Sequence, residues 1–596
     1  MNTKILPVFL LIPLIAIMSP GYKAAQHPAS SGLLVSPRSI TAGEAFLVLA
    51  VAEVPLQEAA IVVTGPNGQI RPMEGRTGGG PPHWREARFQ TYGPGIYQIA
   101  LKKGERFLAS SEFSTLDQIF YRSSSRSIWD IEASWTASAE ALYSAWLERL
   151  FQDAEEGDTW AQLHDVIRDP ENNLLYNHLG KDEDRNLILE PDCADNPFVL
   201  RAYFAWKLGL PYAHFRCDRG TGEMAPICTE WITNLDPRRE GRGDTRAFQV
   251  FVRTILNDVH SGTARTALED DRTDLYPVAL EREHLRPGVV FADPYGHTLT
   301  LVRWVPQTDS SAGRLLAVDA QPDGTIAVKR FWQGNFFFVT EGIPGGPGFK
   351  AFRPLALEDG ELRLLDNAAI AEHPEYGDFS LEQQELSPQI FYDRMDRLIN
   401  PDPLDPETAF RELHKAVFDR LEARALAVRN GEAYMEQEGY SVMPMPSGAA
   451  IFQTLGPWED YSTPSRDMRM LISFDVLLDF PDKVSRDPKA FRIPAGKTAA
   501  QVRTELEALH HQWAAEYSIS YPLSDGGEQG LSMAEVIDRL EDLEMGYNPN
   551  DCIEIRWGAP EGSSELAACK RRAPEAQRAK MRRYRRWFRE RVIPFR

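Results

Sequence analysis

The chain has 596 residues, a length that suggests three or four domains of about 150 residues each. Its 86 acidic and 65 basic residues give a formal net charge of −21, which argues against a general nucleic-acid binder. Charged residues make up 25% and hydrophobic residues 43%. This composition excludes a wholly disordered chain, a collagen-like repeat and a polytopic membrane protein. Five cysteines are too few for a disulfide-dense scaffold.

The N-terminus has the pattern of a secretory signal peptide. Lys4 precedes an apolar run of 14 residues (5–18), and small residues follow it, at Ser19 and Gly21 or at Ala24 and Ala25. The run is too short to cross a bilayer about 30 Å thick as a helix. We therefore expect residues 1–25 to be a signal peptide and the mature protein to be periplasmic or secreted. An uncleaved N-terminal anchor is the alternative.

The cysteines divide into two pairs and a remainder. Cys217 and Cys228 are 11 residues apart, and Cys552 and Cys569 are 17 apart. Gly and Pro residues between the members of each pair indicate loops that a disulfide could close. Cys193 is left over. An odd cysteine in an exported protein is either an intermolecular bridge or a free reactive thiol, and an inert buried cysteine is the alternative.

Residues 30–115 predict a β-sandwich. Short runs rich in β-branched and aromatic residues alternate with Gly/Pro turn clusters. These runs lie at 33–35, 45–54, 59–65, 87–92 and 95–101. Within the last of them, Ile96-Tyr97-Gln98-Ile99 after Pro94-Gly95 resembles a late strand of an immunoglobulin-like fold. We therefore expect an immunoglobulin-like β-sandwich at the N-terminus.

Residues 127–345 mix helix and strand patterns, behind a linker at 121–126. One helix is expected around Leu142, Trp146 and Leu150, which share a face. A second helix is expected over roughly 195–208, with Asn196 as cap and Pro197 in the first turn, and residues 263–280 read as a charged, helix-like segment. Strands are predicted at 289–292, 298–305, 314–319, 325–332 and 336–339, with a turn at 321–324.

Residues 350–596 predict a mostly helical third region. A helix should begin at residues 405–406 and end at Asn430-Gly431, where the turn residues suggest a stop. Capping boxes at 498–501 and 532–535 predict two further helix starts. The overall expectation is an α+β multidomain protein.

The last 27 residues, 570–596, hold 12 basic and two acidic residues. Met581, Tyr584 and Phe588 would share one face of a helix there. This pattern is typical of a basic amphipathic helix that contacts an anionic membrane or polymer. The alternative is that the aromatic face docks on the protein's own chain.

Three residues in the middle region could form a catalytic triad. Cys193 lies near a predicted helix start, where the helix dipole favours a thiolate. His297 follows a glycine at the start of a strand, 104 residues later, and could take the thiol proton. Asp319 ends the next strand and could orient the imidazole across a hairpin. His214 and His260 are rival bases.

The surroundings of the thiol raise two further questions. The carboxylates of Asp192 and Asp195 flank Cys193, and their negative charge would oppose a thiolate. Asn173 or Asn177 could donate to an oxyanion. No nucleotide, dinucleotide or metal-protease motif is present, and we expect no cofactor and no metal.

The segment Pro191-Asp192-Cys193-Ala194-Asp195, with the helix after it, resembles the nucleophile segment of NlpC-like cell-wall cysteine peptidases. Residues 285–291 and Gly296-His297 with the strand that follows are similar to that family's strand pair. The transglutaminase-like branch shares the Cys–His–Asp order. The resemblance covers roughly residues 130–340 and implies a papain-like domain with acyl chemistry at amide bonds. The interval from Cys193 to His297 is longer than is usual for the NlpC-like family.

These observations lead to one leading hypothesis and two alternatives. The leading one is an exported cysteine hydrolase that cleaves peptide or amide bonds, with peptidoglycan stem peptides as the substrate that the resemblance implies. The alternatives are a transglutaminase-type acyl transferase and a non-catalytic binding or scaffold protein on a papain-like fold.

Overall fold

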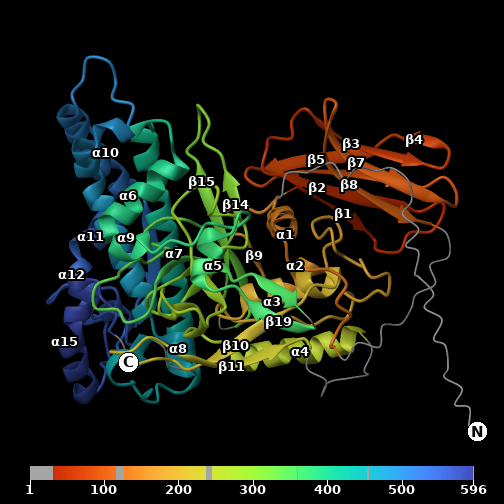
Figure 1. The fold of residues 1–596 in the computed structure, drawn as a ribbon. Coiled ribbons are helices and arrows are strands. Elements are labelled where there is room, and N and C mark those ends of the chain that lie inside the picture. Colours follow the sequence, from red (N-terminus) through yellow and green to blue (C-terminus); the bar gives the residue numbers. More distant parts are fainter. Residues whose placement is uncertain are drawn as a thin grey trace, which may run out of the picture.

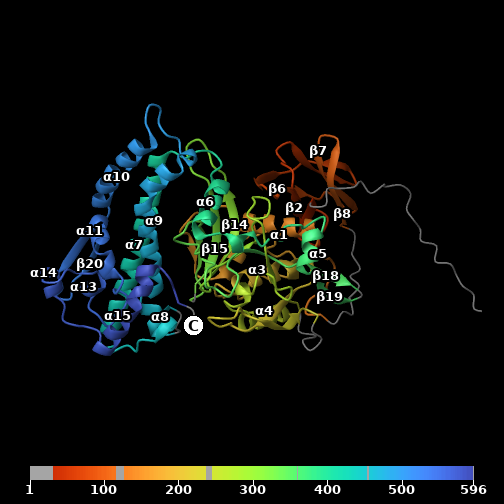
Figure 2. The ribbon, with the colours of Figure 1, turned by 60° about the vertical axis from the view of Figure 1, so that its left-hand side comes forward.

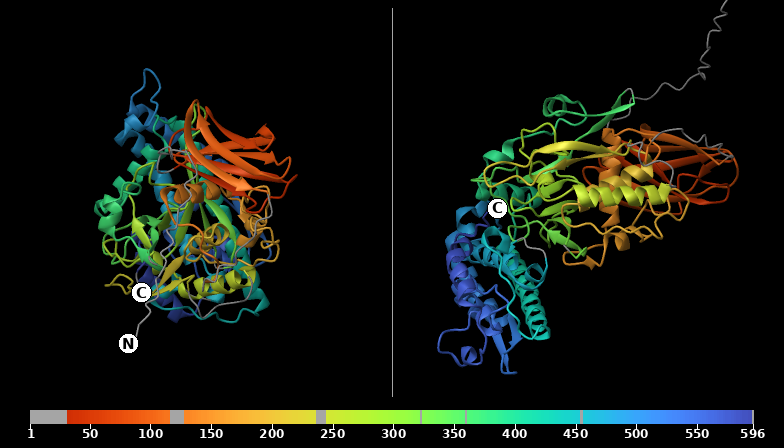
Figure 3. Two further views of the ribbon diagram at one scale, coloured as in Figure 1. Left: turned by 45° about the vertical axis from the view of Figure 1, so that its right-hand side comes forward. Right: turned by 90° about the horizontal axis from the view of Figure 1, so that it is seen from below.

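The computed structural model describes residues 31–115, 127–235, 244–321, 323–358, 360–452 and 456–594. Three parts follow one another along the chain and in space, with the mixed α/β part in the middle (Figures 1 and 2). Seen from below, the β-sandwich lies at one end and the C-terminal helices at the other (Figure 3). The protein is therefore of the expected α+β class. The predicted signal peptide and the predicted linker at 121–126 lie outside the described residues.

The N-terminal part consists of two four-stranded antiparallel sheets, of order β1-β2-β6-β5 and β4-β3-β7-β8. Its strands are β1 Gly32–Ser36, β2 Ala45–Ala52, β3 Ala59–Gly65, β4 Gly68–Ile70, β5 Glu74–Gly79, β6 His83–Gln90, β7 Ile96–Lys103 and β8 Arg106–Ser114. Both sheets contribute to one core, in which Val48 and Phe89 of one face Val63 and Leu101 of the other. The five predicted strand runs are confirmed.

Helix α1 (Ala137–Leu150) joins the sandwich to the middle part, as Figure 1 shows. Trp146 and Leu147 lie in the same core cluster as Leu49 of β2. At the edge of this contact Arg149 Nε donates to Glu86 Oε2 of β6 at 3.0 Å, and both side chains are buried. A buried, hydrogen-bonded ion pair costs free energy when either partner is lost, so the sandwich is tied to α1 in one orientation.

The middle part is built on a seven-stranded sheet of order β12-β17-β13-β14-β15-β16-β9. Its elements are β9 Thr159–Trp160, α2 Leu163–Ile167, α3 Asn196–Leu208, β10 Ala213–Cys217, β11 Cys228–Thr233, α4 Asp244–Asp258, β12 Leu275–Pro277, β13 Val290–Ala292, β14 Thr298–Val305, β15 Arg314–Ala320, β16 Ile326–Arg330 and β17 Gly348–Phe352. Successive residues of a strand face opposite sides. Accordingly Leu316 and Val318 pack toward α1 and α3, whereas Leu315 and Ala317 lie in a second core.

Three predictions for the middle part are wrong. Residues 263–280 form a 3₁₀ turn (Thr263–Arg265) and the short strand β12 in place of a helix. Residues 336–339 are not a strand: Phe336 and Phe338 are buried, but the amide of Phe338 donates to the Tyr392 hydroxyl instead of a strand. The predicted boundary at 345–350 cuts the sheet, because β17 pairs with both β12 and β13.

The remaining elements form a hairpin and a helical region. They are β18 Leu355–Glu358, β19 Glu361–Leu364, α5 Asn367–Glu372, α6 Pro388–Ile399, α7 Pro406–Gln437, α8 Pro457–Tyr461, α9 Pro464–Arg486, α10 Ala499–Glu516, β20 Ser518–Pro522, β21 Glu528–Ser532, α11 Met533–Asp538, α12 Leu540–Leu543, α13 Ile553–Arg556, α14 Ser564–Ala567 and α15 Glu575–Glu590. Both predicted capping boxes are present, at Thr498 and Ser532. Helix α6 packs on the sheet of the middle part, where Phe391 and Met395 are fully buried.

The predicted end of a helix at Asn430-Gly431 is wrong, because α7 continues to Gln437. Gly431 does not end α7; it lets the helix pack closely against neighbouring segments. A Cβ at this position would lie 2.6 Å from the Tyr461 carbonyl oxygen and 2.8 Å from an Arg556 nitrogen. Tertiary contacts therefore outweigh the low helix propensity of glycine.

The basic helix α15 docks on its own chain. Met581 and Phe588 are at most 1% exposed, inside a cluster with Met435 and Tyr547. Arg585 Nε donates to the buried Glu544 at 2.6 Å. The docking alternative is thus confirmed for the apolar face. Contact of the outward arginines with an anionic surface stays a prediction.

Both predicted cysteine pairs are disulfides, Cys217–Cys228 and Cys552–Cys569, and Cys193 is a free thiol. Along the described ranges, no helix combines the length and the apolar character needed to cross a bilayer.

Gly431→Ala is expected to destabilise the protein by about 1–3 kcal/mol, because the new methyl group overpacks the contact between α7 and α8. Denaturant unfolding of the full chain measures the change. Gly530→Ala is the matched control, since a Cβ there meets no heavy atom within 4 Å. Equal stability of the two variants would contradict the packing role.

Candidate active site

Cys193 lies in the turn that leads into α3. Asp192 organises this turn: its Oδ1 accepts from the amides of Ala194 at 2.8 Å and Asp195 at 3.2 Å, and its carbonyl accepts from the amide of Asn196 at 3.0 Å. Helix α3 begins at Asn196 with Asp195 as its N-cap residue, so the prediction that Asn196 caps the helix is wrong. The thiol lies at the positive end of the α3 dipole, as the sequence predicted.

His297 lies immediately before β14, at the end of a tight turn. The amide of Asp293 donates to the His297 carbonyl at 2.7 Å, which closes the turn. Gly296 has φ 109°, a value that residues with a side chain rarely adopt. The glycine that singled out His297 in the sequence therefore shapes the turn that presents the imidazole.

The three predicted residues come together. His297 Nε2 lies 2.9 Å from Asp319 Oδ2, and Cys193 is near enough for its side chain to raise the pKa of the imidazole. Because Nε2 serves the carboxylate, Nδ1 is the ring nitrogen left for the thiol. Thr298 donates from its hydroxyl to the Cys193 carbonyl, which fixes the start of β14 against the turn before α3.

The electrostatics of the site favour an ion pair between His297 and Asp319. Burial opposes the charge on His297, but the adjacent Cys193 and Asp319 outweigh it and raise the pKa of the imidazole to about 10. Burial also opposes the charge on Asp319, yet the hydrogen bond and the charge of His297 hold the pKa of this carboxyl below its usual value. The His297 side chain is 22% exposed and Cys193 is half-buried.

The two acids that flank the thiol behave differently from the expectation. Asp195 is 4% exposed. Burial, followed by the charge of Asp192, raises the pKa of Asp195 to about 9. At neutral pH Asp195 is therefore uncharged and adds no negative charge beside Cys193. The opposition predicted from two carboxylates reduces to Asp192 alone, whose carboxylate is occupied by backbone amides.

The rival bases are engaged elsewhere. His214 is fully buried, with Nε2 3.4 Å from Asp258 Oδ2. His260 uses Nε2 for the Cys217 carbonyl at 2.8 Å and Nδ1 for the amide of Gly262 at 3.0 Å. Neither histidine serves as the base for Cys193.

Of the two predicted oxyanion donors, Asn173 has its side-chain NH2 group engaged elsewhere. Asn173 binds the Trp146 indole through Oδ1 and the Ile167 carbonyl through Nδ2. Asn177 Oδ1 accepts from the amide of Asp182 at 2.8 Å. Both amide side chains hold the loop before Cys193 instead.

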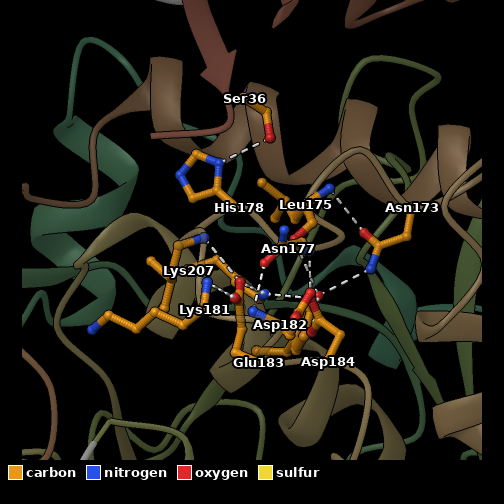
Figure 4. A network of polar contacts seen from close by, with 12 residues as sticks. Ser36, Asn173, Leu175, Asn177, His178, Lys181, Asp182, Glu183, Asp184 and Lys207 are labelled. Carbon is orange, nitrogen blue, oxygen red and sulfur yellow. Dashed lines mark hydrogen bonds and ion pairs between the residues drawn. The ribbon is translucent and has the colours of Figure 1, made fainter. Parts of the chain in front are cut away.

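The C-terminal half of α3 is anchored by a buried polar network, which Figure 4 shows. Lys207 Nζ donates to Glu183 Oε1 and, at 2.6 Å, to Asp184 Oδ2, and all three side chains are fully buried. The Tyr203 hydroxyl donates to Asp184 Oδ1 at 2.8 Å. Charge-assisted hydrogen bonds at Tyr203 and Lys207 therefore hold the C-terminal half of α3 in place.

The same network reaches the β-sandwich. His178 Nδ1 lies 3.0 Å from the Ser36 hydroxyl at the end of β1. Burial lowers the pKa of His178 to about 3, so the ring is neutral and can share a neutral hydrogen bond. The sandwich therefore braces the loop that leads to the thiol.

Sequence reasoning missed two residues of the site. Gln321 donates through Nε2 to Asp319 Oδ2 at 2.9 Å. Thr298 holds the Cys193 carbonyl. The spacing of two residues between Asp319 and Gln321 was a usable signal, because Gln321 directly follows β15 and the alternation of an extended chain places both side chains on one side.

Comparison with known proteins adds no relative, because no family model, no curated protein and no solved structure matches this chain.

Lys207→Met is expected to destabilise the protein by about 3–5 kcal/mol, because two buried carboxylates lose their cation. Denaturant unfolding measures the loss. Exposed Lys489→Met is the matched control. A loss below about 1 kcal/mol, the range of surface pairs, would show that the buried network does not depend on this charge.

Asp195→Asn is expected to stabilise the protein at pH 8 by on the order of 2–4 kcal/mol and to have no effect below about pH 4. The unfolded carboxyl ionises above about pH 4 whereas the folded one stays protonated, so the stability of the native protein falls as pH rises between these values. The amide side chain of the variant does not ionise, so the stability of the variant does not fall for this reason as pH rises. Unfolding at pH 4, 6 and 8 measures it, with exposed Asp309→Asn as control. Parallel pH profiles for the two variants would refute the neutral state of Asp195.

Proposed function

We propose that this chain is a cysteine hydrolase that cleaves peptide or amide bonds through Cys193, His297 and Asp319. One observation carries the proposal: the imidazole of His297 hydrogen-bonds a buried carboxylate and lies near enough to the free thiol of Cys193 for the two side chains to interact electrostatically. This is the arrangement that activates a sulfur nucleophile. A plain structural cysteine would need neither partner.

The geometry supports a two-step acyl transfer. The Cys193 sulfur, as thiolate, attacks the carbonyl carbon of the scissile amide, and His297 gives its Nδ1 proton to the departing amine nitrogen. The resulting thioester is attacked by water, whose proton passes to His297 as the sulfur leaves as thiolate. Asp319 holds the ring orientation throughout and stabilises the imidazolium.

Several finer assignments belong to the same proposal. The residue types around Cys193 and His297 support a papain-like middle domain, and the paired sheets of the sandwich, with the Tyr97 hydroxyl donating to the Gly93 carbonyl at 2.7 Å, support an immunoglobulin-like one. Two disulfides support an exported protein. Peptidoglycan stem peptides are the first substrate to assay.

A transglutaminase-type acyl transferase is the second candidate. The carboxylate identity of the third residue, Asp319, favours it, since that branch shares the Cys–His–Asp order. In this reaction an amine replaces water in the second step. Release of a peptide fragment and incorporation of a labelled amine distinguish the two reactions.

Alkylation of Cys193 tests the proposal on the full chain, with the four disulfide cysteines as unreactive background. The wild type should react readily at pH 6, and His297→Ala should lower the rate at this pH by about tenfold or more, because the partner that favours the thiolate is lost. Asp319→Asn should lower it less.

His260→Ala is the matched control and should leave the alkylation profile unchanged. A wild-type profile centred near the reference thiol value of about 8.5, with no response to His297→Ala, would refute catalysis and leave the binding or scaffold alternative.

A further inference from the structure

The turn that presents His297 is held together by one buried acid. Asp293 is fully buried. Its amide donates to the His297 carbonyl at 2.7 Å, its carbonyl accepts from the Gly296 amide at 3.1 Å, and its Oδ1 accepts from the Tyr295 amide at 2.6 Å. Three hydrogen bonds of one residue therefore fix the backbone directly before the imidazole.

A buried carboxylate requires compensation. Burial raises the pKa of Asp293, and Arg469 is the first of the groups that oppose this. The Arg469 Nη2 lies 3.5 Å from Asp293 Oδ2, and its Nη1 donates to the Asn335 carbonyl at 3.2 Å. The guanidinium also lies over the Phe337 ring, 4.4 Å from its centroid. These contacts leave Arg469 only 23% exposed and keep it directed at the acid.

Arg469 comes from α9, in the C-terminal helical region beside the middle part (Figure 2). The same region touches the turn a second time. The Tyr295 ring packs on the cluster that contains Ile593, and Tyr295 hydrogen-bonds the Ile593 backbone. The turn before His297 therefore rests on residues that are 176 and almost 300 positions later in the chain.

Other charged groups face the site from different elements. Arg265 donates to the Pro294 carbonyl at 3.4 Å and interacts with Asp293 through its charge alone. Lys329 on β16 and Arg420 on α7 interact electrostatically with Asp319. Among these cations, Arg469 is the one that reaches ion-pair distance of Asp293.

We propose, on the basis of the function proposed above, that Arg469 is a positioning residue for the catalytic imidazole. By holding Asp293, the guanidinium fixes the turn 293–296 so that His297 reaches Cys193 and Asp319 together. The C-terminal helical region therefore supplies a residue that positions the imidazole of the active site.

The experiment compares alkylation rates of Cys193 between pH 5 and 9 in full-length variants. Arg469→Met should lower the rate at pH 6 by about five- to tenfold and move the profile toward that of His297→Ala. Arg469→Lys keeps the charge and should restore most of the rate. Exposed Arg466→Met, on the same helix, is the matched control and should leave the profile unchanged.

A double-mutant cycle with Asp293→Asn separates positioning from general stability. Once the acid is neutral, Arg469→Met should have little additional effect on the alkylation profile. A shift in melting temperature without a shift in the profile, or equal effects of Arg469→Met in both backgrounds, overturns the positioning role. The proposed function fails separately, if the wild type itself does not respond to His297→Ala. If Arg469→Met does not fold, Arg469→Lys and Asp293→Asn carry the comparison.

Discussion

The hydrogen bond between His297 and Asp319 is the contact on which the candidate site depends. It joins the residue before β14 to β15 at 2.9 Å, it fixes which ring nitrogen faces Cys193, and it compensates a carboxylate that is 3% exposed. Together with Cys193, this partner outweighs burial and raises the pKa of the imidazole. The antiparallel pairing of β14 with β15 and the turn before β14 bring His297 within hydrogen-bond distance of Asp319.

The sequence predicted the local features well. Most strand runs, the capping boxes and the disulfide pairs follow from periodicity or from neighbours a few residues apart, and they are found in the structure, as is the contact between His297 and Asp319. The failures have a common cause. Asn430-Gly431 has the residues of a helix end, yet contacts from other helices keep α7 continuous across it. Apolar runs such as 336–339 are buried without becoming strands, because a side-chain hydroxyl satisfies their backbone.

The charge state of the site could not be predicted from the sequence at all. Two aspartates beside a thiol indicate repulsion, but burial removes the charge of Asp195 and backbone amides occupy Asp192. Arg469 lies 176 residues from Asp293, and no spacing rule connects them. Burial and long-range pairing decide protonation, and both become known only when the fold is known.

The dependence of the turn 293–296 on α9 and on Ile593 has a consequence for biosynthesis. A ribosome releases the thiol, the imidazole and the carboxylate long before it releases the helices that hold the turn in place. A nascent polypeptide that has released Asp319 but not yet Arg469 and Ile593 therefore has the three candidate side chains without these contacts to the turn 293–296.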